Sequence, residues 1–453
     1  MKIEIKSKVL DVTRQTDVLV VGGGPAGIGA AVAAAWQGSK VMLLEKHGFL
    51  GGNITASYVE TCNYFFRGTP FEPSGVWADM ESKYRAIFGR SHDIRPNANN
   101  RFSSEYLKIF LDGYLREAGV EVLLHSFVND VVMEGDKIAA VIIQSKQGPI
   151  AIQAGMVIDA TGDGDVAYSA GIPFEMGRDT DHLCQPGTLS FRIAGVNAAL
   201  MIANGEDQLR EIGRQYKADY RAGLTGLPCK RQDLPFGRLT PGGQVSYVNY
   251  PCAYGVDSTS IDDMSRAEAE CRSYILDMVY YMREHFVGME HVELASIATE
   301  VCFRDSRRIA GRYRLTIEDM ESNRHFKDVI AVYPRFYDML APDAYMDGDG
   351  SVEGKGYKGH IYEHDTEGRS FEIPYLSLVP EKVNNLLVSG RCISCDHVAE
   401  SGIRAISACT QTGQAAGIAA VLALKGNVIP ADIDIVELQG VLRKQGVVLP
   451  EKI

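Results

Sequence analysis

The chain has 453 residues, a formal net charge of -12 and 45% hydrophobic residues. This length exceeds a usual single hydrophobic core and indicates two or three domains. The acidic balance, without a long lysine or arginine cluster, argues against nucleic acid and an anionic membrane surface as partners.

The N-terminal segment, residues 1–10, alternates charged and apolar side chains and has no apolar core of signal-peptide length. The longest apolar run near the C-terminus, residues 415–424, is too short to cross a bilayer. Nine scattered cysteines do not resemble the disulfide framework of a secreted protein. Together these features predict a cytoplasmic protein.

The first strong motif is a short apolar run followed by a glycine triplet. Residues 18–21 predict a buried strand, and Gly22, Gly24 and Gly27 then fit the G-x-G-x-x-G pattern. In that pattern the first glycine permits a tight turn, the second lets the backbone approach a pyrophosphate, and the third allows close packing of helix and strand. The motif predicts the first βαβ unit of a dinucleotide-binding domain, with phosphates at the positive end of a helix that begins near Pro25.

A carboxylate and a second glycine loop follow this unit. Glu45 stands at the end of the next apolar run, where it can accept hydrogen bonds from the hydroxyls of an adenosine ribose without a 2′-phosphate. Gly51 and Gly52 expose backbone N–H groups that could cradle a phosphate or flank a flat ring. An ordinary turn is the alternative for this loop.

The next segment predicts a helix and a group of strands. Residues 105–118 carry an apolar stripe at helical spacing, and Gly119 stands where a C-cap would be. Three apolar runs separated by short turns, residues 120–127, 128–133 and 138–144, predict a strand followed by a small antiparallel meander.

The second motif is a strand that ends in Ala-Thr-Gly at residues 160–162. Such small residues allow close contact between the backbone and a ligand, and Asp163 and Asp165 follow in the turn. Alternatively, these acids form only an Asx-turn and a helix cap, because residues 166–170 have a helical pattern.

The pattern changes after Arg178. Apolar alternation at 188–193 and 244–248 mixes with amphipathic segments at 263–287 and 303–314, and no glycine-rich nucleotide turn recurs. This mixture predicts a separate, inserted α+β domain.

An arginine cluster lies inside this middle region. If the segment is helical, Arg304, Arg307 and Arg308 share one face, which would hold an acidic substrate bidentately. Pairing with acidic residues of the same domain is the alternative. Arg307 is the candidate substrate anchor.

Residues 342–354 resemble a calcium-binding loop in composition. The required glycine and the bidentate glutamate at the twelfth position are out of register. We therefore expect a mobile polar loop and no metal site.

The last informative segment contains another strand and a helix rich in small residues. Residues 383–391 predict a buried strand that ends in Gly-Arg, and residues 401–424 predict a helix with many glycines and alanines. Such a helix can press against another backbone or a planar ring.

Together these motifs resemble the FAD-dependent oxidoreductases of the glutathione-reductase-like flavoprotein superfamily, and more narrowly a bacterial group of that name. The similarity extends over nearly the whole chain, from about residue 17 to about residue 424. It is carried by the glycine fingerprint with Glu45, residues 51–53, 160–165 and 304–311, the segment 373–375, and Gly390-Arg391 with the helix at 412–417.

The resemblance implies an α/β fold: a Rossmann-like FAD-binding domain, with a parallel sheet and a small antiparallel meander, and an inserted α+β substrate domain. The FAD-binding domain is discontinuous, residues 1–177 and 375–453, and the inserted domain is residues 178–374. FAD is the implied cofactor. The implied cofactor-binding residues are Gly22, Gly24, Pro25, Ala26, Gly27, Glu45, Lys46, Gly51, Gly52, Asn53, Val128, Ala160, Thr161, Gly162, Asp163, Gly390, Arg391, Ser401, Gly402 and Ile403.

We therefore predict an enzyme that transfers a hydride between flavin and a small organic substrate held between the two domains. His397, Glu400 and Arg404 are candidate polar groups at the flavin. His397 would serve as a general acid or base at neutral pH, or is a loop histidine with satisfied hydrogen bonds.

Two other classes of function stay open. Cys392 and Cys395 form a C-x-x-C that could act as a redox dithiol in a flavin-linked thiol or disulfide reductase, or they are small buried residues. The second class is a non-catalytic flavoprotein or an electron-transfer subunit that needs a partner. The electron donor or acceptor is NAD(P)H that docks transiently, or another molecule.

Overall fold

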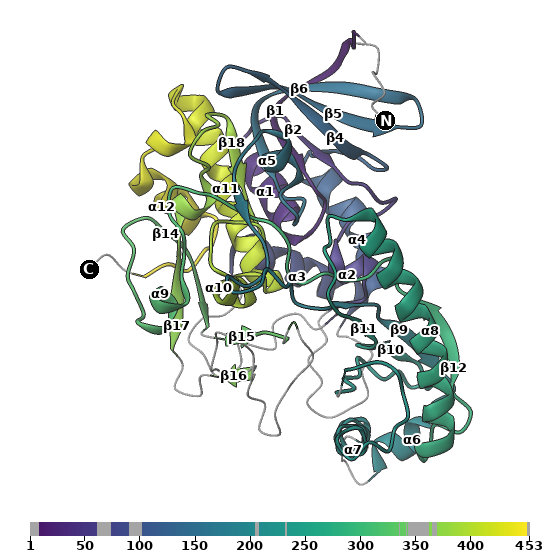
Figure 1. The fold of residues 1–453 in the computed structure, drawn as a ribbon. Coiled ribbons are helices and arrows are strands. Elements are labelled where there is room, and N and C mark those ends of the chain that lie inside the picture. The colour runs from purple at the N-terminus through teal and green to yellow at the C-terminus, as the bar shows by residue number, and fades with distance from the viewer. Residues whose placement is uncertain are drawn as a thin grey trace.

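The structure is a computed structural model in which the N-terminal and C-terminal parts lie side by side, while α8 and its neighbouring strands extend away from them (Figure 1). It describes residues 9–60, 74–89, 102–203, 208–231, 233–334, 336–340, 342, 362–364 and 369–450. Within these residues, no helix combines the length and apolarity needed to cross a membrane.

The main sheet combines parallel strands with an antiparallel meander, as predicted. Its order is β3-β2-β1-β6-β5-β4, and β18 pairs with β6 beside the meander. All neighbours are parallel except the β4–β5 and β5–β6 pairs. The strands are β1 (Val12–Val21), β2 (Val41–Leu44), β3 (Glu121–Leu123), β4 (Phe127–Glu134), β5 (Lys137–Ser145), β6 (Gly148–Asp159) and β18 (Leu386–Val388).

The register of the parallel strands aligns their carboxyl ends. Val21 of β1 and Val388 of β18 both pair with Asp159 of β6. The loops that follow these three strands therefore begin at one edge of the sheet, where parallel α/β sheets bind ligands.

Helices α1 (Pro25–Trp36) and α11 (Ile406–Gly426) are in direct backbone contact. A Cβ added at Gly413 would lie 1.9 Å from the backbone oxygen of Ala26, and one at Gly417 would lie 2.2 Å from that of Ala30. The small residues of α11 therefore serve helix packing against a backbone, one of the two uses predicted from the sequence.

The predicted single helix at 401–424 is wrong in one respect. The chain forms α10 (His397–Ile403), then leaves helical geometry at Ala405, where ψ is 139°, and begins α11 at Ile406. Alanine is a strong helix former, so Ala405 gives no sign of this break in the sequence.

Four further helices accompany the main sheet: α2 (Asn53–Ala56), α3 (Gly75–Phe88), α4 (Ser104–Glu117) and α5 (Asp165–Ser169). Helix α4 confirms the helix predicted at 105–118, and α5 confirms the helical pattern after Asp165. The apolar side chains of these elements share one buried cluster with α1 and α11.

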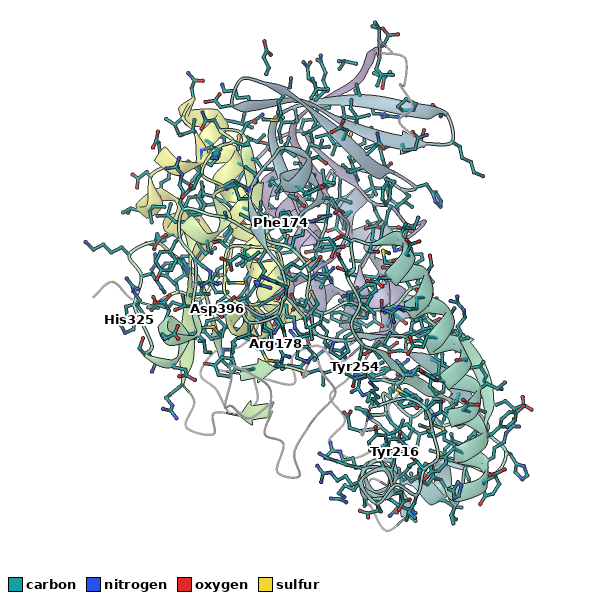
Figure 2. All side chains as sticks on the ribbon, viewed as in Figure 1. Phe174, Arg178, Tyr216, Tyr254, His325 and Asp396 are labelled. Atoms are coloured by element: carbon teal, nitrogen blue, oxygen red, sulfur yellow. The ribbon has the colours of Figure 1, made fainter. Side chains whose placement is uncertain are left out.

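A second buried cluster is built from residues 189–301 and Tyr58. It contains a three-stranded antiparallel sheet and the long helix α8, which confirms the amphipathic helix predicted at 263–287. Tyr216 of this cluster lies near the lower end of the molecule, whereas Phe174 lies near its middle (Figure 2). Its elements are β9 (Phe191–Ala194), α6 (Ala198–Met201), α7 (Gln208–Arg221), β10 (Val245–Val248), α8 (Ile261–His285) and β12 (Glu293–Ile297).

The chain that follows the second cluster packs again with the first buried cluster, which includes apolar residues between Ile309 and Ile373. Short elements complete the chain: β7 (Phe174–Glu175), β8 (Gly187–Thr188), β11 (Cys252–Ala253), β13 (Arg308–Ile309), α9 (Ile317–Glu321), β14 (Val329–Pro334), β15 (Phe336–Asp338), β16 (Tyr362–His364), β17 (Ser370–Pro374) and α12 (Ile435–Lys444). The domain boundaries at residues 177 and 375 stay a prediction.

The helix predicted at 303–314 is wrong. Only β13 (Arg308–Ile309) has regular structure there, so the three arginines share no helical face. The charged and apolar residues of this segment follow turns instead of a helical repeat. The loop at 342–354 falls outside the described residues, apart from Pro342.

Candidate functional site

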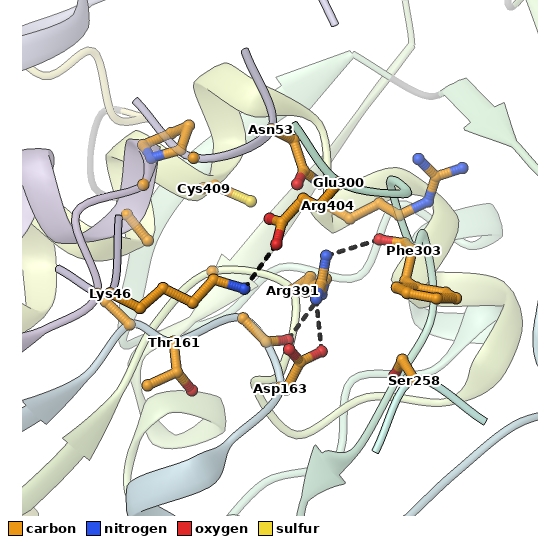
Figure 3. A pocket seen from close by; sticks show the side chains of 18 of the residues that line it. Lys46, Asn53, Thr161, Asp163, Ser258, Glu300, Phe303, Arg391, Arg404 and Cys409 are labelled. Carbon is orange, nitrogen blue, oxygen red and sulfur yellow. Dashed lines mark hydrogen bonds and ion pairs between the residues drawn. The ribbon is translucent and has the colours of Figure 1, made fainter. Parts of the chain in front are cut away.

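One pocket opens at the carboxyl edge of the main sheet (Figure 3). The loops after β1, β6 and β18 line one side, and the start of α8 with the segment after β12 lines the other. The lining residues are Gly22, Gly24, Pro25, Ala26, Glu45, Lys46, His47, Gly52, Asn53, Ala160, Thr161, Gly162, Asp163, Ser258, Met264, Glu268, Glu300, Val301, Phe303, Ser389, Gly390, Arg391, Arg404, Ile406 and Cys409.

The three glycines of the fingerprint differ in why they must be glycine. A Cβ at Gly22, where φ is +107°, would lie 2.3 Å from the backbone oxygen of Ala160, and one at Gly27 would lie 1.7 Å from that of Gly22. A Cβ at Gly24 would meet only the Cα of Gly52, at 3.7 Å, and φ there is -77°. The packing of the chain therefore requires glycine at the first and third positions but not at Gly24.

Space beside Gly24 fits the approach of a ligand to the start of α1. No side chain caps this helix, and its first turn carries no acidic residue. Its first N–H groups and the positive end of the helix dipole therefore face the pocket, and no acidic side chain of its own first turn neutralises them. A dinucleotide pyrophosphate matches this backbone cradle in charge and in hydrogen bonding.

Glu45 is held in a fixed orientation at the pocket. Its Oε2 accepts the Gly23 N–H at 2.8 Å and its Oε1 accepts the His47 N–H at 2.8 Å, and the residue is only 5% exposed. Each carboxylate oxygen keeps a further lone pair. This geometry fits the predicted contact with two ribose hydroxyls.

Lys46 forms an ion pair with Glu300 across the pocket, and His47 contacts the same carboxylate. Lys46 Nζ lies 2.9 Å from Oε2 of Glu300, and His47 Nε2 lies 3.2 Å from Oε1. Burial raises the pKa of Glu300, but the hydrogen bond from His47 and the charge of Lys46 outweigh burial and lower the pKa to about 2. These contacts join the loop after β2 to the segment after β12, 254 residues apart.

Arg391 connects three parts of the pocket wall. Its Nε donates to the backbone oxygen of Gly162 at 2.7 Å, one terminal nitrogen donates to that of Phe303 at 2.6 Å, and the other pairs with the Asp163 carboxylate. Figure 3 shows these contacts on the side of the pocket opposite Cys409. The guanidinium of Arg391 therefore fixes the wall, and the Asp163 carboxylate is engaged with it.

A second ionic cluster lies outside the pocket lining. The exposed fractions of Asp305, Arg308, His397 and Glu400 do not exceed 6%. The same terminal nitrogen of Arg308 lies 3.1 Å from the Asp305 carboxylate and 3.4 Å from that of Glu400, and His397 Nδ1 lies 2.9 Å from Asp305. We call these four residues the enclosed cluster.

The two carboxylates of the enclosed cluster have opposite pKa shifts. Burial raises the pKa of Asp305, but the hydrogen bond and charge of His397 lower it to about 2. Burial and the charge of Asp305 raise the pKa of Glu400 well above its ordinary value. Asp305, His397 and Glu400 place ligand atoms within 4.8 Å of one another. Arg308 already supplies the positive charge between the carboxylates, so we assign no metal to this cluster.

A model of the family described as FAD dependent oxidoreductase matches residues 17–442. This chain belongs to that family. Its cofactor is FAD, and the open glycine cradle at α1 and the oriented Glu45 fit the pyrophosphate and the ribose of that cofactor.

Curated relatives of this FAD-dependent oxidoreductase are similar to it over part of their own length. The thiamine thiazole synthase of Aeropyrum pernix is 29% identical over 161 residues, which are 33% of this chain and 55% of that protein. That of Methanococcus vannielii is 33% identical over 156 residues, 33% of this chain and 56% of that protein. The digeranylgeranylglycerophospholipid reductase 2 of Methanothermobacter thermautotrophicus is 29% identical over 188 residues, 40% and 47% of the two chains. The chain thus spans about half the length of the curated relatives it matches.

Solved structures are similar over more of the chain. A geranylgeranyl bacteriochlorophyll reductase-like protein from Thermoplasma acidophilum matches with a TM-score of 0.46 and 14% identity, over 96% of this chain and 84% of that chain. The myxobacterial chondrochloren halogenase matches with a TM-score of 0.46 and 13% identity, over 95% of this chain and 79% of that chain.

Most residues predicted to bind FAD line the pocket. Gly27 and Gly51 are not among the lining residues; φ of Gly51 is +111°, and a Cβ there would lie 2.5 Å from Cγ2 of Thr55. The others outside the lining are Val128, on β4, and the α10 residues Ser401, Gly402 and Ile403. Because the helix breaks after α10, Ile406 and Cys409 at the start of α11 line the pocket instead.

Of the three residues predicted to be catalytic, Arg404 lines the pocket, and His397 and Arg307 do not. Arg307 donates to Asp165 at 2.9 Å, and its guanidinium lies 4.2 Å from the ring centre of Tyr168. Arg307 is thus paired with an acidic residue, but Asp165 lies before residue 178, so this is not the pairing within the middle region that the sequence left open. The roles assigned to these three residues stay predictions.

The middle region contributes lining residues that the sequence motifs did not indicate: Ser258, Met264, Glu268, Glu300, Val301 and Phe303. They come from two separate segments that are brought together only by folding of the second cluster. Thr299 helps to hold them at the pocket, because its N–H donates to the backbone oxygen of Ala56 at 2.8 Å.

The C-x-x-C cysteines are buried and lie outside the pocket lining. Cys392 is 0% exposed and Cys395 is 2% exposed. Burial raises the pKa of both thiols well above the ordinary value, and nearby carboxylates raise it further. A thiolate, the reactive form, is therefore disfavoured at both positions.

Proposed function

We propose that the chain is an oxidoreductase that transfers a hydride between FAD and a small organic substrate. The observation that carries the proposal is the composition of the single pocket described above. Its first wall has the glycine cradle and Glu45, which suit FAD, and its second wall comes from the middle region. A substrate bound against the second wall would lie beside the cofactor.

The residues of the chain would orient the two reactants. The start of α1 and Glu45 would hold the cofactor, and the start of α11, where Ile406 lines the pocket, would stabilise negative charge with the positive end of its dipole. Phe303 and Ser258 would contact the substrate. When bound, FAD supplies the two-electron chemistry.

His397 stays a predicted general acid or base. It is enclosed beside Asp305 and does not line the pocket, so a proton would have to pass between its ring and the pocket through neighbouring polar groups. A His397→Ala variant that binds FAD and turns over a substrate at the wild-type rate would exclude this role.

We further propose that the chain belongs to the bacterial group within the glutathione-reductase-like flavoprotein superfamily. The fingerprint with Glu45, the turn after β6 and the helix after β18 support this placement. We also propose that residues 178–374 are inserted between the halves of the FAD-binding domain. Pairing of β18 with β6 and contact of α11 with α1 support the union of the two halves.

The first test is the visible absorption spectrum of the purified protein, followed anaerobically while NADH and then NADPH are added. Bleaching of the flavin band would identify a reductase supplied by nicotinamide. A band that persists would direct the search to substrates or protein partners that donate electrons directly. A colourless protein that takes up no FAD would contradict the proposal.

A further inference from the structure

Four side chains next to one another carry buried polar atoms without a hydrogen-bond partner in the described structure. The atoms are Nε2 of Gln185, Oε1 of Glu400, Nε of Arg404 and Nε2 of His397, whose other ring nitrogen faces Asp305. A buried polar atom without a partner destabilises the fold, so native proteins satisfy nearly all of them. Arg404 lines the pocket and the other three lie outside its lining, so these atoms mark a place at the edge of the pocket where another polar group belongs.

Two of these side chains present hydrogen-bond donors in fixed orientations. Gln185 is 2% exposed, and its Oε1 accepts the Leu340 N–H at 3.1 Å and lies 3.5 Å from a terminal nitrogen of Arg404. That nitrogen of Arg404 also donates to the backbone oxygen of Asp338 and lies 3.4 Å from the Asp338 carboxylate. The amide nitrogen of Gln185 and Nε of Arg404 remain as neighbouring donors.

Arg404 differs from the other cations of the pocket. Lys46 is paired with Glu300, and Arg391 is paired with Asp163 and two backbone oxygens. Among the lining residues, Arg404 is the cation that keeps a buried donor without an acceptor. In Figure 3 its side chain extends past Phe303, on the side of the pocket away from Lys46.

We propose that Arg404 and Gln185 bind the carboxylate of the substrate, so that this chain acts on an organic acid. The inference rests on the proposed function for the presence of a substrate at this wall. A guanidinium beside a primary amide complements a carboxylate in charge and in donors. The nearby Asp338 carboxylate would repel a dianion such as phosphate more strongly than a monoanion. Phe303 offers an apolar surface to the body of the acid.

The test compares benzoate with benzamide, which have the same shape but differ in charge. Each is added to the oxidised, FAD-loaded protein, and the flavin difference spectrum gives its dissociation constant. We expect benzoate to bind about tenfold or more tightly than benzamide, because only benzoate forms an ion pair with Arg404, whereas benzamide accepts the hydrogen bond as a neutral group. Acetate and acetamide provide a second matched pair for a smaller site.

Variants locate the binding. Arg404→Gln should weaken benzoate binding about tenfold or more and weaken benzamide binding less, because benzamide loses no ion pair. Gln185→Leu should also weaken benzoate binding more than benzamide binding, with a smaller effect on both. Arg404→Lys should fall between wild type and Arg404→Gln, because lysine keeps the charge but loses the planar geometry. The exposed Arg214→Gln is the matched control and should leave both constants unchanged. FAD content shows that each variant folds.

Equal dissociation constants for benzoate and benzamide would overturn the inference, as would failure of every carboxylate to perturb the flavin spectrum. The inference would also be overturned if the Arg404→Gln variant bound benzoate with the wild-type dissociation constant. These outcomes are separate from a failure of the proposed function, because carboxylate binding to the oxidised protein requires no turnover. A protein that binds benzoate through Arg404 but reduces no acceptor would keep the carboxylate site and lose the hydride transfer.

Discussion

Two groups of ionic side chains lie at or near the pocket, and they differ in solvent access. Lys46, with its side chain 44% exposed, and Glu300, 26% exposed, meet across the pocket. Arg308 and Glu400 are at most 1% exposed. Water can replace a lost partner in the first group but not in the second, so equal changes in charge should have unequal effects.

The largest effect should follow removal of the cation from the enclosed cluster. Arg308→Met would leave Asp305 and Glu400 buried without their shared partner, and we expect a loss of about 3–5 kcal/mol in the free energy of unfolding. Urea denaturation of the FAD-loaded protein measures this. The exposed Arg214→Met is the control and should change stability little. Equal losses in both variants would show that burial does not govern these ion pairs.

The two glutamates should give opposite dependences of stability on pH. The pKa of Glu400 is raised in the folded state, so stability should fall as the pH rises above the unfolded value of about 4.5. The pKa of Glu300 is lowered to about 2, so its contribution is present above about pH 4.5 and is lost as the pH falls toward 2.

Urea midpoints measured across this pH range test the comparison. Glu400→Gln should flatten the slope above pH 4.5, and Glu300→Gln should flatten the slope below it. Each variant is the control for the other. A Glu400→Gln variant that keeps the wild-type slope above pH 4.5 would show that Glu400 is already ionised in the folded protein.

A smaller effect is expected on cofactor retention. Glu300→Gln weakens the contacts with Lys46 and His47 across the pocket, and we expect FAD to dissociate about two- to fivefold more readily. Fluorescence of released FAD measures the dissociation constant. Exchanging the two charges, as Lys46→Glu with Glu300→Lys, should restore part of the affinity. If the Glu300→Gln variant binds FAD with wild-type affinity, the Lys46–Glu300 pair serves only to connect the two protein segments and does not contribute to FAD binding.

The smallest effect is expected from thiol alkylation. Cys392 and Cys395 are enclosed, and burial raises their thiol pKa values, so iodoacetamide should leave both unmodified in the folded, FAD-loaded protein. Mass spectrometry of tryptic peptides checks this, with urea-unfolded protein as the positive control. Rapid modification that abolishes turnover would revive the dithiol reductase.

The parts of the fold that follow from local sequence were predictable. The strand before Gly22 and the helix after it show in apolar periodicity and glycine spacing, and α8 shows in its amphipathic pattern. The segment at 303–314 was mistaken because charged and apolar residues can share a helical spacing while lying in a buried, irregular segment. The break before Ile406 was missed because no proline marks it and Ala405 is a strong helix former.

The candidate site was predictable only on the cofactor side. Gly24 and Glu45 belong to one contiguous motif whose spacing reflects the ligand. Glu300 and Phe303 reach the pocket through the tertiary structure, and no repeat or motif surrounds them in the sequence. The pairing of Arg307 with Asp165 likewise depends on two segments 142 residues apart.

The backbone contact between α1 and α11 has a consequence for protein synthesis. The face of α1 that carries Gly29 packs tightly against α11, because a Cβ at Gly29 would lie 2.2 Å from the backbone oxygen of Thr410. Helix α11 is translated about 380 residues after Gly29. Until that helix emerges from the ribosome, α1 lacks its main neighbour. We therefore expect nascent chains that end before Ile406 to depend on chaperones and to retain no FAD, although they already contain the complete fingerprint.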